Sequence, residues 1–576
     1  MHIKLLAIGK VIEVRGSQIV AELDLDIIEL SRVYEGEVYD IGQFGSILRI
    51  HFGRKTIFAM VNRLRMKAEY EMERIGRSDA QPDQRVLEAD LIGEGRYIST
   101  ASAQGQPILR FERGISTYPL PLQTVYLTPK DELRAIYTGE HASPIEIGTY
   151  VGAEDSPCLL DLSELVGKHA AILGSTGTGR SACVAALLKG IMELGEGGDK
   201  DTWRPTVIVL DPHNEYARAF PQGCVLSPDD GTLSLPYWLM SLQETVELLT
   251  GRTEQAATAQ ASIIKDALAA GKHVTSQDDE ETAGEITVDS PIPYNLDAFT
   301  EHIESEKPGT KTGQGPYNSV LEKLRILRED VRMSFMMSPE SGANEPAGTD
   351  HVDALVSIMR SLLGDGRGPS IVDLSGVPSE VAGILTGTIA RLLFSWRLWQ
   401  SSEERERNPI LLVCEEAHLY VPNRGNAQFA EAQQAVRRVV REGRKYGLSL
   451  IVVSQRPSEI DEAVLSQCNS WIVLRIGNDN DRERVRAALP ESMAGLASVL
   501  SSLRRQEAVV LGQATTLPAR IRIRTLAPSE LPLSHDIDYL EGWSHGNADP
   551  AVMRRIARRW QTQGRDAQPL ATGELP

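Results

Sequence analysis

The segment that most constrains the fold of this chain is residues 168–192, KHAAILGSTGTGRSACVAALLKGIM. A short apolar run, a glycine-rich stretch and a helical pattern follow one another, which predicts a strand, a tight loop and a helix. Glycines in such a loop let successive backbone N–H groups point inward, and the N-terminus of the next helix adds positive potential, so the loop is suited to phosphate. We therefore predict a phosphate-binding loop made of Gly174, Ser175, Thr176, Gly177, Thr178, Gly179, Arg180, Ser181 and Ala182.

The residue types of this loop also predict a divalent cation. The Ser181 hydroxyl would be a ligand of Mg²⁺, as in other loops of this spacing. The position usually held by lysine is Arg180. A lysine is a slim point charge and an arginine is a planar fork, so the two are not equivalent beside phosphates. We expect nucleotide binding to survive this exchange better than hydrolysis; the alternative is a glycine turn with a chance arginine.

Length and composition bound the class of protein. The 576 residues exceed the roughly 250 to 300 at which single cores stop growing, so at least two domains are expected. Hydrophobic residues make up 41% and charged residues 24%, which is typical of globular proteins. The five cysteines are scattered and form no CxxC pair, which argues against structural zinc and disulfides. We find no signal-peptide pattern and no membrane-spanning apolar stretch, and expect a cytoplasmic protein without membrane attachment.

Hydrophobic patterning predicts an α/β protein of several parts. Period-2 runs with frequent turns predict a β-barrel over 1–145, the alternative being a sheet that belongs to the main core. Continuous apolar strands alternate with helices over 146–240 and 366–525, which is typical of a parallel sheet covered on both faces. Residues 241–365 are expected to be a helical insertion with an acidic mobile loop, TSQDDEETAGE. Residues 526–576 are expected to form a C-terminal brace with a disordered tail.

The C-terminal brace contains a basic amphipathic pattern, DPAVMRRIARRWQTQ. Asp549 is suited to cap a helix and Pro550 to its first turn. Val552, Ile556 and Trp560 recur at helical spacing with arginines between them. The apolar face would pack on the same subunit, on a neighbouring subunit or on a partner.

Two carboxylates follow one apolar strand, in PILLVCEEAHLYVP. Ligands of open α/β sheets bind beyond the carboxyl ends of the strands, so we expect Glu415 to hold Mg²⁺ and Glu416 to act as general base toward water. The alternative is an exposed acidic pair in a loop. Asp211 ends another apolar strand and would join the magnesium or water network, or stabilise an Asp-Pro turn.

Polar residues at a further strand end complete the predicted site. The strand LSLIVVSQRPSEI ends near Gln455, which would sense the γ-phosphate or be an ordinary polar strand terminus. The segment QAVRRVVREGRKYG places Arg437, Arg441, Arg444 and Lys445 on a predicted helix. In a ring, Arg444 would reach a neighbour's phosphate; the alternative is a solvated charged face.

The motifs GSTGTGRS, DPHNEY, LPYWLM, ITVDSPIPY, IVDLSG, VCEEAH, EGRKYGLSLIVVSQRPSEI and LSQCN, in this order, make the chain resemble the bacterial HerA proteins. The resemblance implies a RecA-like, additional-strand P-loop ATPase core that uses ATP and Mg²⁺. It also implies a homohexamer that moves double-stranded DNA through its pore. Gln455 matches the family's sensor position. Lys168 stands where the family has an arginine that is thought to reach the neighbour's nucleotide.

The resemblance extends to partners. HerA-like proteins work with a NurA-like nuclease or, in phage defence, with a sirtuin-type NAD-consuming enzyme or another nuclease, and the N-terminal barrel is the expected docking surface. Because Arg180 and Lys168 keep charge but change geometry, a nucleotide-binding scaffold with weak hydrolysis is the alternative. A secretion or conjugation ATPase is a third alternative, although such motors usually need a membrane span. The net charge of −19 requires any DNA-binding groups to be concentrated on one surface.

Overall fold

The chain is divided into two compact units. The first comprises Met1–Leu165, Ala170–Leu194 and Asn469–Thr525, and the second Val166–His169, Gly195–Cys468 and Leu526–Pro576. The computed structural model describes residues 6–27, 29–34, 36–81, 83–98, 108–138, 143–151, 153–197, 203–251, 257–276, 286–311, 313–337, 351–423, 430–488, 499–533, 539–544 and 549–562.

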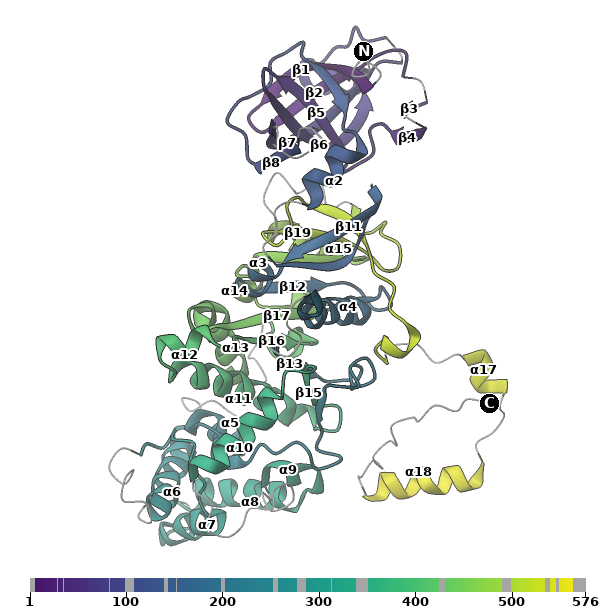
Figure 1. Ribbon diagram of the computed structural model, residues 1–576. Helices are drawn as coiled ribbons and strands as arrows, with labels where there is room; N and C mark the ends of the chain where they lie inside the picture. The colour runs from purple at the N-terminus through teal and green to yellow at the C-terminus, as the bar shows by residue number, and fades with distance from the viewer. Residues whose placement is uncertain are drawn as a thin grey trace. The chain divides into compact units, whose positions relative to one another are not determined.

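The alternating runs of the N-terminal region form a closed barrel (Figure 1). Its strands follow the order β2-β1-β9-β5-β6-β7, and β2 pairs with β7 to close the ring. Register shifts at Phe58/Ala59 and Val61/Arg63 bend the long strands β6 and β7, as closure of a small barrel requires. The bounds are β1 Ala7–Arg15, β2 Gln18–Leu23, β5 Ile47–Phe52, β6 Lys55–Met66, β7 Arg85–Ile98 and β9 Thr124–Leu127. The barrel is a sheet of its own, as predicted.

Smaller elements decorate the barrel. Strand β8, Ile108–Arg113, pairs with β7 and lies outside the closed ring. Strands β3, Ser31–Tyr34, and β4, Glu37–Asp40, form a separate ribbon. Helices α1, Lys67–Ile75, and α2, Lys130–Thr138, follow β6 and β9. Alternating side chains such as Ile8, Ile19 and Ile57 fill the interior.

The first unit also contains a mixed sheet with the strand order β11-β10-β20-β19-β18-β12. Strands β12 and β18 are parallel, and the other neighbours in this order are antiparallel. The bounds are β10 Pro144–Tyr150, β11 Ala153–Asp161, β12 Ala170–Leu173, β18 Ser470–Leu474, β19 Glu507–Gly512 and β20 Ala519–Ile523. The helices are α3 Leu162–Val166, which continues one residue into the second unit, α4 Arg180–Glu193 and α15 Asp479–Ala488.

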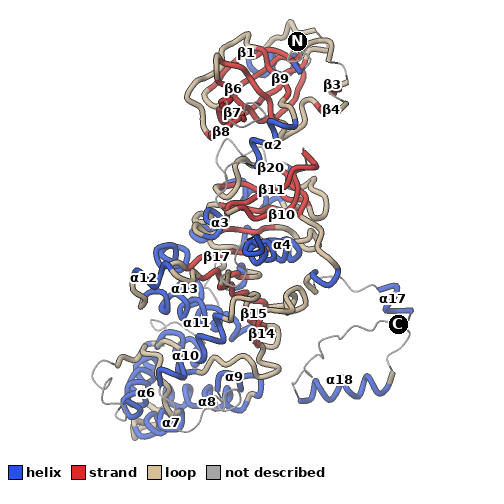
Figure 2. The backbone as a smooth tube through the Cα atoms, in the orientation of Figure 1, coloured by secondary structure: helices blue, strands red, loops and turns tan. Residues whose placement is uncertain are grey.

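The second unit contains a parallel sheet with the strand order β17-β16-β13-β15-β14. Figure 2 draws its strands in red and labels β17, β15 and β14. Because the strands are parallel, their carboxyl ends meet at one edge. The bounds are β13 Thr206–Asp211, β14 Cys224–Leu226, β15 Ser370–Asp373, β16 Ile410–Cys414 and β17 Leu448–Ser454. Helices α11, Ser379–Leu398, and α13, Ala430–Glu442, pack on each other and on β17, and α12 spans Ser402–Glu406. The continuous apolar strands expected over 146–240 and 366–525 are present, among them the six strands β12, β13 and β15 to β18.

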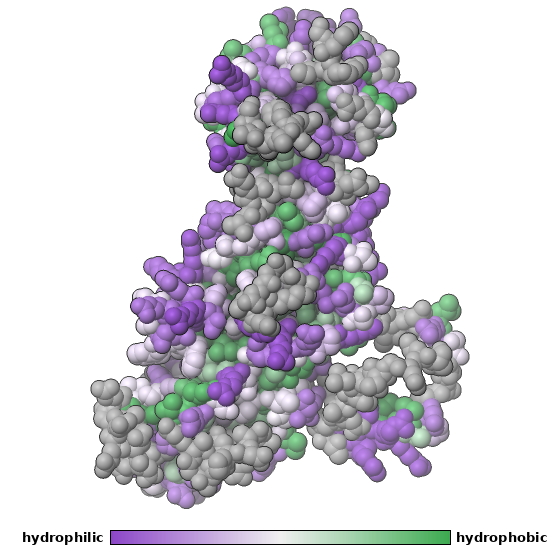
Figure 3. Space-filling model, in the orientation of Figure 1, coloured by the Kyte–Doolittle hydropathy of each residue, from purple (hydrophilic) through white to green (hydrophobic). Residues whose placement is uncertain are grey.

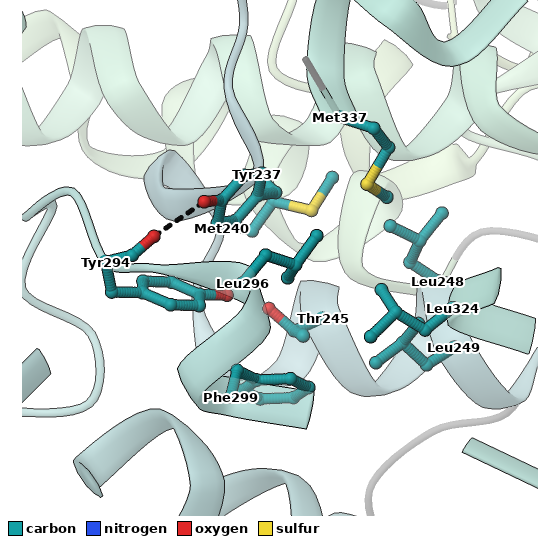
Figure 4. A pocket seen from close by; sticks show the side chains of 10 residues that line it. All are labelled: Tyr237, Met240, Thr245, Leu248, Leu249, Tyr294, Leu296, Phe299, Leu324 and Met337. Carbon is teal, nitrogen blue, oxygen red and sulfur yellow. Dashed lines mark hydrogen bonds between the residues drawn. The ribbon is translucent and has the colours of Figure 1, made fainter. Parts of the chain in front are cut away.

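Helices make up the described part of the insertion. They are α5 Leu242–Thr250, α6 Thr258–Ser276, α7 Leu296–Ser305, α8 Gly315–Glu329, α9 Ser334–Met337 and α10 His351–Leu363. Aromatic and aliphatic side chains, among them Tyr237, Tyr294 and Phe299, line a small apolar cavity between them (Figure 4). The Tyr237 hydroxyl donates to the Tyr294 carbonyl at 2.6 Å, so its polar end is satisfied. Most of the acidic loop, residues 277–285, lies outside the described residues.

One buried lysine ties the insertion together. Lys272 of α6 is 1% exposed and donates to the carbonyls of Val288, at 2.6 Å, and Ser290, at 2.8 Å. Burial lowers the pKa of Lys272 from 10.5 to about 8; Asp289 opposes this shift and Arg391 adds to it. Between pH 8 and 10.5 the unfolded chain then binds more protons than the folded chain, so this group makes the free energy of unfolding rise with pH.

We expect the rise to be roughly 1 to 3 kcal/mol across this window, and Lys272→Met to remove it. Urea denaturation of the wild type and the variant at several pH values from 8 upward checks this, with exposed Lys265 of α6, changed to Met, as the control. A Lys272→Met curve parallel to the wild-type curve would refute the assignment.

The C-terminal helices are α17, Tyr539–Ser544, and α18, Pro550–Thr562. The Asp549 carboxylate accepts the Ala551 N–H at 2.9 Å and Pro550 opens the helix, so the predicted cap is confirmed. Ile556 and Trp560 are exposed, and green hydrophobic atoms lie beside purple hydrophilic ones on α18 (Figure 3). The surface on which α18 docks stays a prediction, and residues 563–576 lie outside the described part.

One stretch of α11, Val381–Leu398, has the length and apolar composition of a membrane span. Of this window 78% is buried inside the structure. Such burial is typical of the core helix of a globular domain, because a helix that is apolar all round belongs in an interior. It is the one such stretch in the part of the chain that the structure describes.

Candidate nucleotide-binding site

The glycine-rich segment of the first unit forms a strand, a loop and a helix, as the sequence predicts. Strand β12 is fully buried and α4 begins at Arg180. Gly177 and Gly179 have φ angles of 74° and 97°, a region that side chains with a Cβ rarely adopt. These conformations turn the chain sharply into the first turn of α4, whose unsatisfied N–H groups are suited to an anion.

Neighbouring backbone holds the loop in place. The Ser175 N–H donates to the Arg475 carbonyl at 3.0 Å, and the Thr178 hydroxyl donates to the Ser175 carbonyl at 2.7 Å. The Gln506 N–H donates to the Thr178 carbonyl at 3.0 Å. Gln506 has a φ of 64°, and a Cβ on Gly179 would lie 3.2 Å from its side chain. Only the tertiary structure identifies this support, because Gln506 is far from the loop in sequence.

The side chain of Arg180 contacts the backbone of the phosphate loop itself. Its guanidinium Nη1 donates to the Gly174 carbonyl at 3.2 Å. Ser181 is buried behind it, whereas Thr176 and Gly177 are exposed at the tip of the loop. To contact a phosphate, the arginine would therefore exchange an existing hydrogen bond for a new one.

The acidic pair of the second unit lies at the end of β16. Glu415 and Glu416 are 4% and 3% exposed, so the alternative of a solvent-exposed acidic loop is wrong. Tyr216 donates its hydroxyl to Glu415, and burial raises the pKa of Tyr216, with the Glu415 charge adding to the shift. Tyr216 is the last residue of DPHNEY and is not among the predicted site residues. Glu416 has a φ of 48°, a left-handed conformation that costs a non-glycine residue about 1 to 2 kcal/mol.

Asp211 ends β13, beside β16 in the same sheet. Its carboxylate accepts N–H groups from His213 at 3.2 Å, Glu215 at 2.8 Å and Tyr216 at 3.0 Å. Burial raises the pKa of Asp211 to about 6, against the effect of the bonds from Tyr216 and His213. The carboxylate therefore stabilises the turn that carries Tyr216; its part in a magnesium network stays a prediction.

Strand β17 lies beside β16 and ends at Ser454, so Gln455 follows the strand next to the acidic pair, as expected. Gln455 is half-buried. The Ser454 hydroxyl accepts the Arg456 N–H at 3.0 Å and lies 3.1 Å from His418 Nδ1. The same Nδ1 lies 3.3 Å from Glu416 Oε2. The local sequence pattern around His418 does not predict this bridge.

The prediction of one arginine-bearing helix over residues 434–447 is wrong. Helix α13 ends at Glu442, and Arg444 lies in a 3-10 turn, Gly443–Tyr446. At Gly443 the chain passes so close to the Leu448 carbonyl that an added Cβ would lie 2.5 Å from it, as the chain turns into β17. Arg437 forms an ion pair with Asp461 of its own unit, whereas Arg444 is exposed.

Lys168 is half-buried and precedes a constrained histidine. His169 has a φ of 56°, and its Nδ1 accepts the Leu450 N–H at 3.0 Å. Burial lowers the pKa of His169 to about 4, and the charge of Arg444 contributes to the shift. An imidazole that stays neutral at physiological pH can keep this acceptor role, which fixes the chain beside Lys168.

Non-glycine residues with positive φ gather near these motifs. Among the described residues they are Leu30, Leu122, His169, Asn214, Asn408, Glu416 and Gln506. Four of them lie near the predicted site motifs. His169 precedes β12, Asn214 and Glu416 follow β13 and β16, and Gln506 contacts the phosphate loop. Strained backbone of this kind clusters at functional sites, because the surrounding structure must enforce it.

Comparisons with known proteins agree with this architecture. The family described as "Helicase HerA, central domain" matches residues 145–393. The DNA double-strand break repair helicase HerA of Pyrococcus furiosus is 28% identical over 436 residues, which cover 69% of this chain and 72% of that protein. The protein of the same name from Sulfolobus acidocaldarius is 27% identical over 415 residues, covering 70% and 73%.

Residues 145–393 of the chain belong to the HerA central-domain family. This HerA-like chain is a P-loop ATPase of the RecA-like, additional-strand class, in which β17 is the strand beside the acidic β16. A solved structure, VirB4 of Thermoanaerobacter pseudethanolicus, is similar at a TM-score of 0.46 and 18% identity, covering 69% of this chain and 99% of VirB4.

Proposed function

We propose that this chain hydrolyses ATP to translocate double-stranded DNA, as one subunit of a homohexameric ring. The observation that carries the proposal is the pair of buried carboxylates, Glu415 and Glu416, at the end of a parallel strand. Burying two carboxylates is costly unless a cation or a function compensates for them. The similarity to HerA helicases supports DNA as the substrate, and ATP hydrolysis would drive the movement of that DNA.

Each site residue has a proposed role. The phosphate loop, residues 174–182, would bind the triphosphate through its N–H groups. Ser181 and Glu415 offer oxygen ligands of the kind Mg²⁺ prefers, and the ion supplies charge neutralisation when bound. Glu416 would polarise the attacking water. The remaining proposed roles are γ-phosphate sensing by Gln455, support of the magnesium and water network by Asp211, and contact with a neighbouring subunit's nucleotide by Arg444 and Lys168.

The test is ATP hydrolysis by the purified full chain with and without duplex DNA. We expect turnover that duplex DNA stimulates, by particles whose native mass equals six chains. Turnover no higher than that of a mock purification, from intact hexamers, would refute the motor. A ring of another size would refute only the proposed stoichiometry.

A second candidate function is a nucleotide-binding scaffold that assembles an effector and hydrolyses little. The hydrogen bond of Arg180 to the Gly174 carbonyl favours this scaffold function. Arg180 is the cationic side chain of the phosphate loop, and it already donates to the backbone of that loop. ATP would then act as a structural ligand that stabilises the assembled state.

Arg180→Lys separates the two functions. We expect this variant to raise ATP turnover by about 10-fold, because a slim ammonium fits between phosphates better than the planar fork does. The measurement is steady-state hydrolysis under saturating ATP, with exposed Arg407, changed to Lys, as the control. Unchanged turnover in Arg180→Lys would show that arginine does not limit the site.

The effector is proposed to be a nuclease, of NurA type or another type, or a sirtuin-type NAD-consuming enzyme, acting in DNA processing or phage defence. We place its docking on the N-terminal barrel, at β8, which pairs with β7 and lies outside the closed ring. Unpaired strand edges are ready binding surfaces for another chain. A purified candidate encoded beside the gene should bind the full chain and lose binding when Arg110 of β8 is replaced by proline. Equal binding to both would refute docking at this edge.

A further inference from the structure

The imidazole of His418 contacts two groups that belong to different strand ends. It lies in the 3-10 turn Ala417–Leu419, directly after the proposed base Glu416. Its Nδ1 is 3.3 Å from Glu416 Oε2, at the end of β16, and 3.1 Å from Ser454 Oγ, at the end of β17. The two side chains His418 and Glu416 are almost fully buried, so water does not screen their interaction strongly.

The single nitrogen Nδ1 of His418 cannot form equally good hydrogen bonds with Glu416 and with Ser454. An ionised Glu416 only accepts hydrogen bonds, so a bond from His418 to it requires a hydrogen on Nδ1. The Ser454 hydroxyl accepts the Arg456 N–H and keeps its own hydrogen, which it can donate to an Nδ1 without hydrogen. The hydrogen-bonding choice of His418 therefore depends on where Ser454 lies, and Ser454 is the residue before Gln455.

The backbone of Glu416 links its orientation to the hydrogen bond that His418 forms. Its left-handed conformation, with φ 48° and ψ 43°, is one that a glutamate adopts only when its surroundings enforce it. The Glu416 carbonyl accepts the Leu419 N–H at 2.8 Å, so the turn that carries His418 also fixes the backbone of Glu416.

We propose that His418 is a positioning residue that couples the orientation of Glu416 to the position of the end of β17 through Ser454. When Nδ1 donates to Glu416, the imidazole holds the carboxylate in the orientation that faces the attacking water. When Nδ1 bonds to Ser454 instead, the carboxylate loses this support. The strand end that carries the proposed γ-phosphate sensor thereby controls the base. This inference rests on the proposed role of Glu416.

The test compares full-length His418→Ala, His418→Gln, Ser454→Ala and the double variant His418→Ala/Ser454→Ala. For each we would measure the kcat and KM of ATP hydrolysis with duplex DNA, the binding of a fluorescent ATP analogue, and the melting temperature. His302→Ala and Ser262→Ala are controls on the helical insertion. We expect His418→Ala to lower kcat about 10- to 100-fold with a nearly unchanged KM, because it removes positioning of the base and leaves the phosphate loop intact.

Two further results are expected. The double variant should be no slower than His418→Ala, because both changes break one chain of contacts. His418→Gln should recover part of the lost kcat, since an amide N–H can still contact Glu416. A wild-type kcat in His418→Ala, or losses that are additive, would overturn the inference and leave the ATPase proposal standing. If His418→Ala lowered kcat, analogue binding and melting temperature together, and His418→Gln restored none of them, His418 would have a merely structural role. That result would also overturn the inference. A wild-type chain without turnover would overturn both proposals, before any variant is compared.

Discussion

Replacing Glu416 with glutamine is expected to lower the rate of ATP hydrolysis by roughly 100- to 10,000-fold, the usual contribution of a general base. Glutamine keeps the shape and the buried position of the side chain and removes its capacity to take a proton. Nucleotide binding should persist, because the phosphate loop of residues 174–182 is untouched. The measurement is single-turnover hydrolysis alongside the binding affinity for a fluorescent ATP analogue.

The matched control is Glu442→Gln, the same change at an exposed carboxylate that ends α13. It should leave turnover within about twofold of the wild-type value, since exposed substitutions rarely perturb a buried site. A Glu416→Gln variant that retains more than about a tenth of the wild-type rate would exclude Glu416 as the base.

Replacing Arg397 with methionine is expected to destabilise the second unit by about 3 kcal/mol or more, because buried polar groups would lose their partners. The Arg397 side chain is 1% exposed. Its guanidinium donates to the carbonyls of Tyr446 at 2.6 Å, Arg407 at 3.1 Å and Asn408 at 3.4 Å, and also to that of Arg405. Methionine fills much of the volume but leaves these carbonyls without donors.

The Arg397→Met effect is measured as a shift of the denaturation midpoint, or of the melting temperature by about 5 to 10 °C. Exposed Arg441 of α13, changed to methionine, is the control and should shift neither quantity appreciably. Because Arg397 holds the Tyr446 carbonyl, the variant should also loosen the turn that carries Arg444, and faster proteolysis near residues 443–447 would report this. Equal midpoints for the two variants would contradict the structural role of Arg397.

Local patterning was enough to predict several elements. Continuous apolar runs gave the six core strands, because a strand buried on both faces excludes polar residues. The glycine spacing predicted the phosphate loop, since its conformation needs φ angles that glycine adopts easily. Asp549 and Pro550 predicted the start of α18 for an equally local reason.

Long-range contacts could not be predicted in this way. Helix α13 ends at Glu442, and the chain at Gly443 then passes close to Leu448, a long-range approach that no helical pattern indicates. Tyr216 binds Glu415 across 199 residues of sequence. Gln506 supports the phosphate loop from the start of a distant strand.

The sequence by itself determined the chemistry that this protein has available: a glycine loop for phosphate, two carboxylates after an apolar strand, and an arginine in place of a lysine. These follow from residue types and short spacings, which local backbone geometry translates directly into structure. Only the tertiary structure decided how those groups are held, with Arg180 on the Gly174 carbonyl and His418 between Glu416 and Ser454. The contact of His418 with Ser454 depends on which strand ends meet at one edge of a sheet, and strand order is set by packing of the whole core rather than by any local pattern.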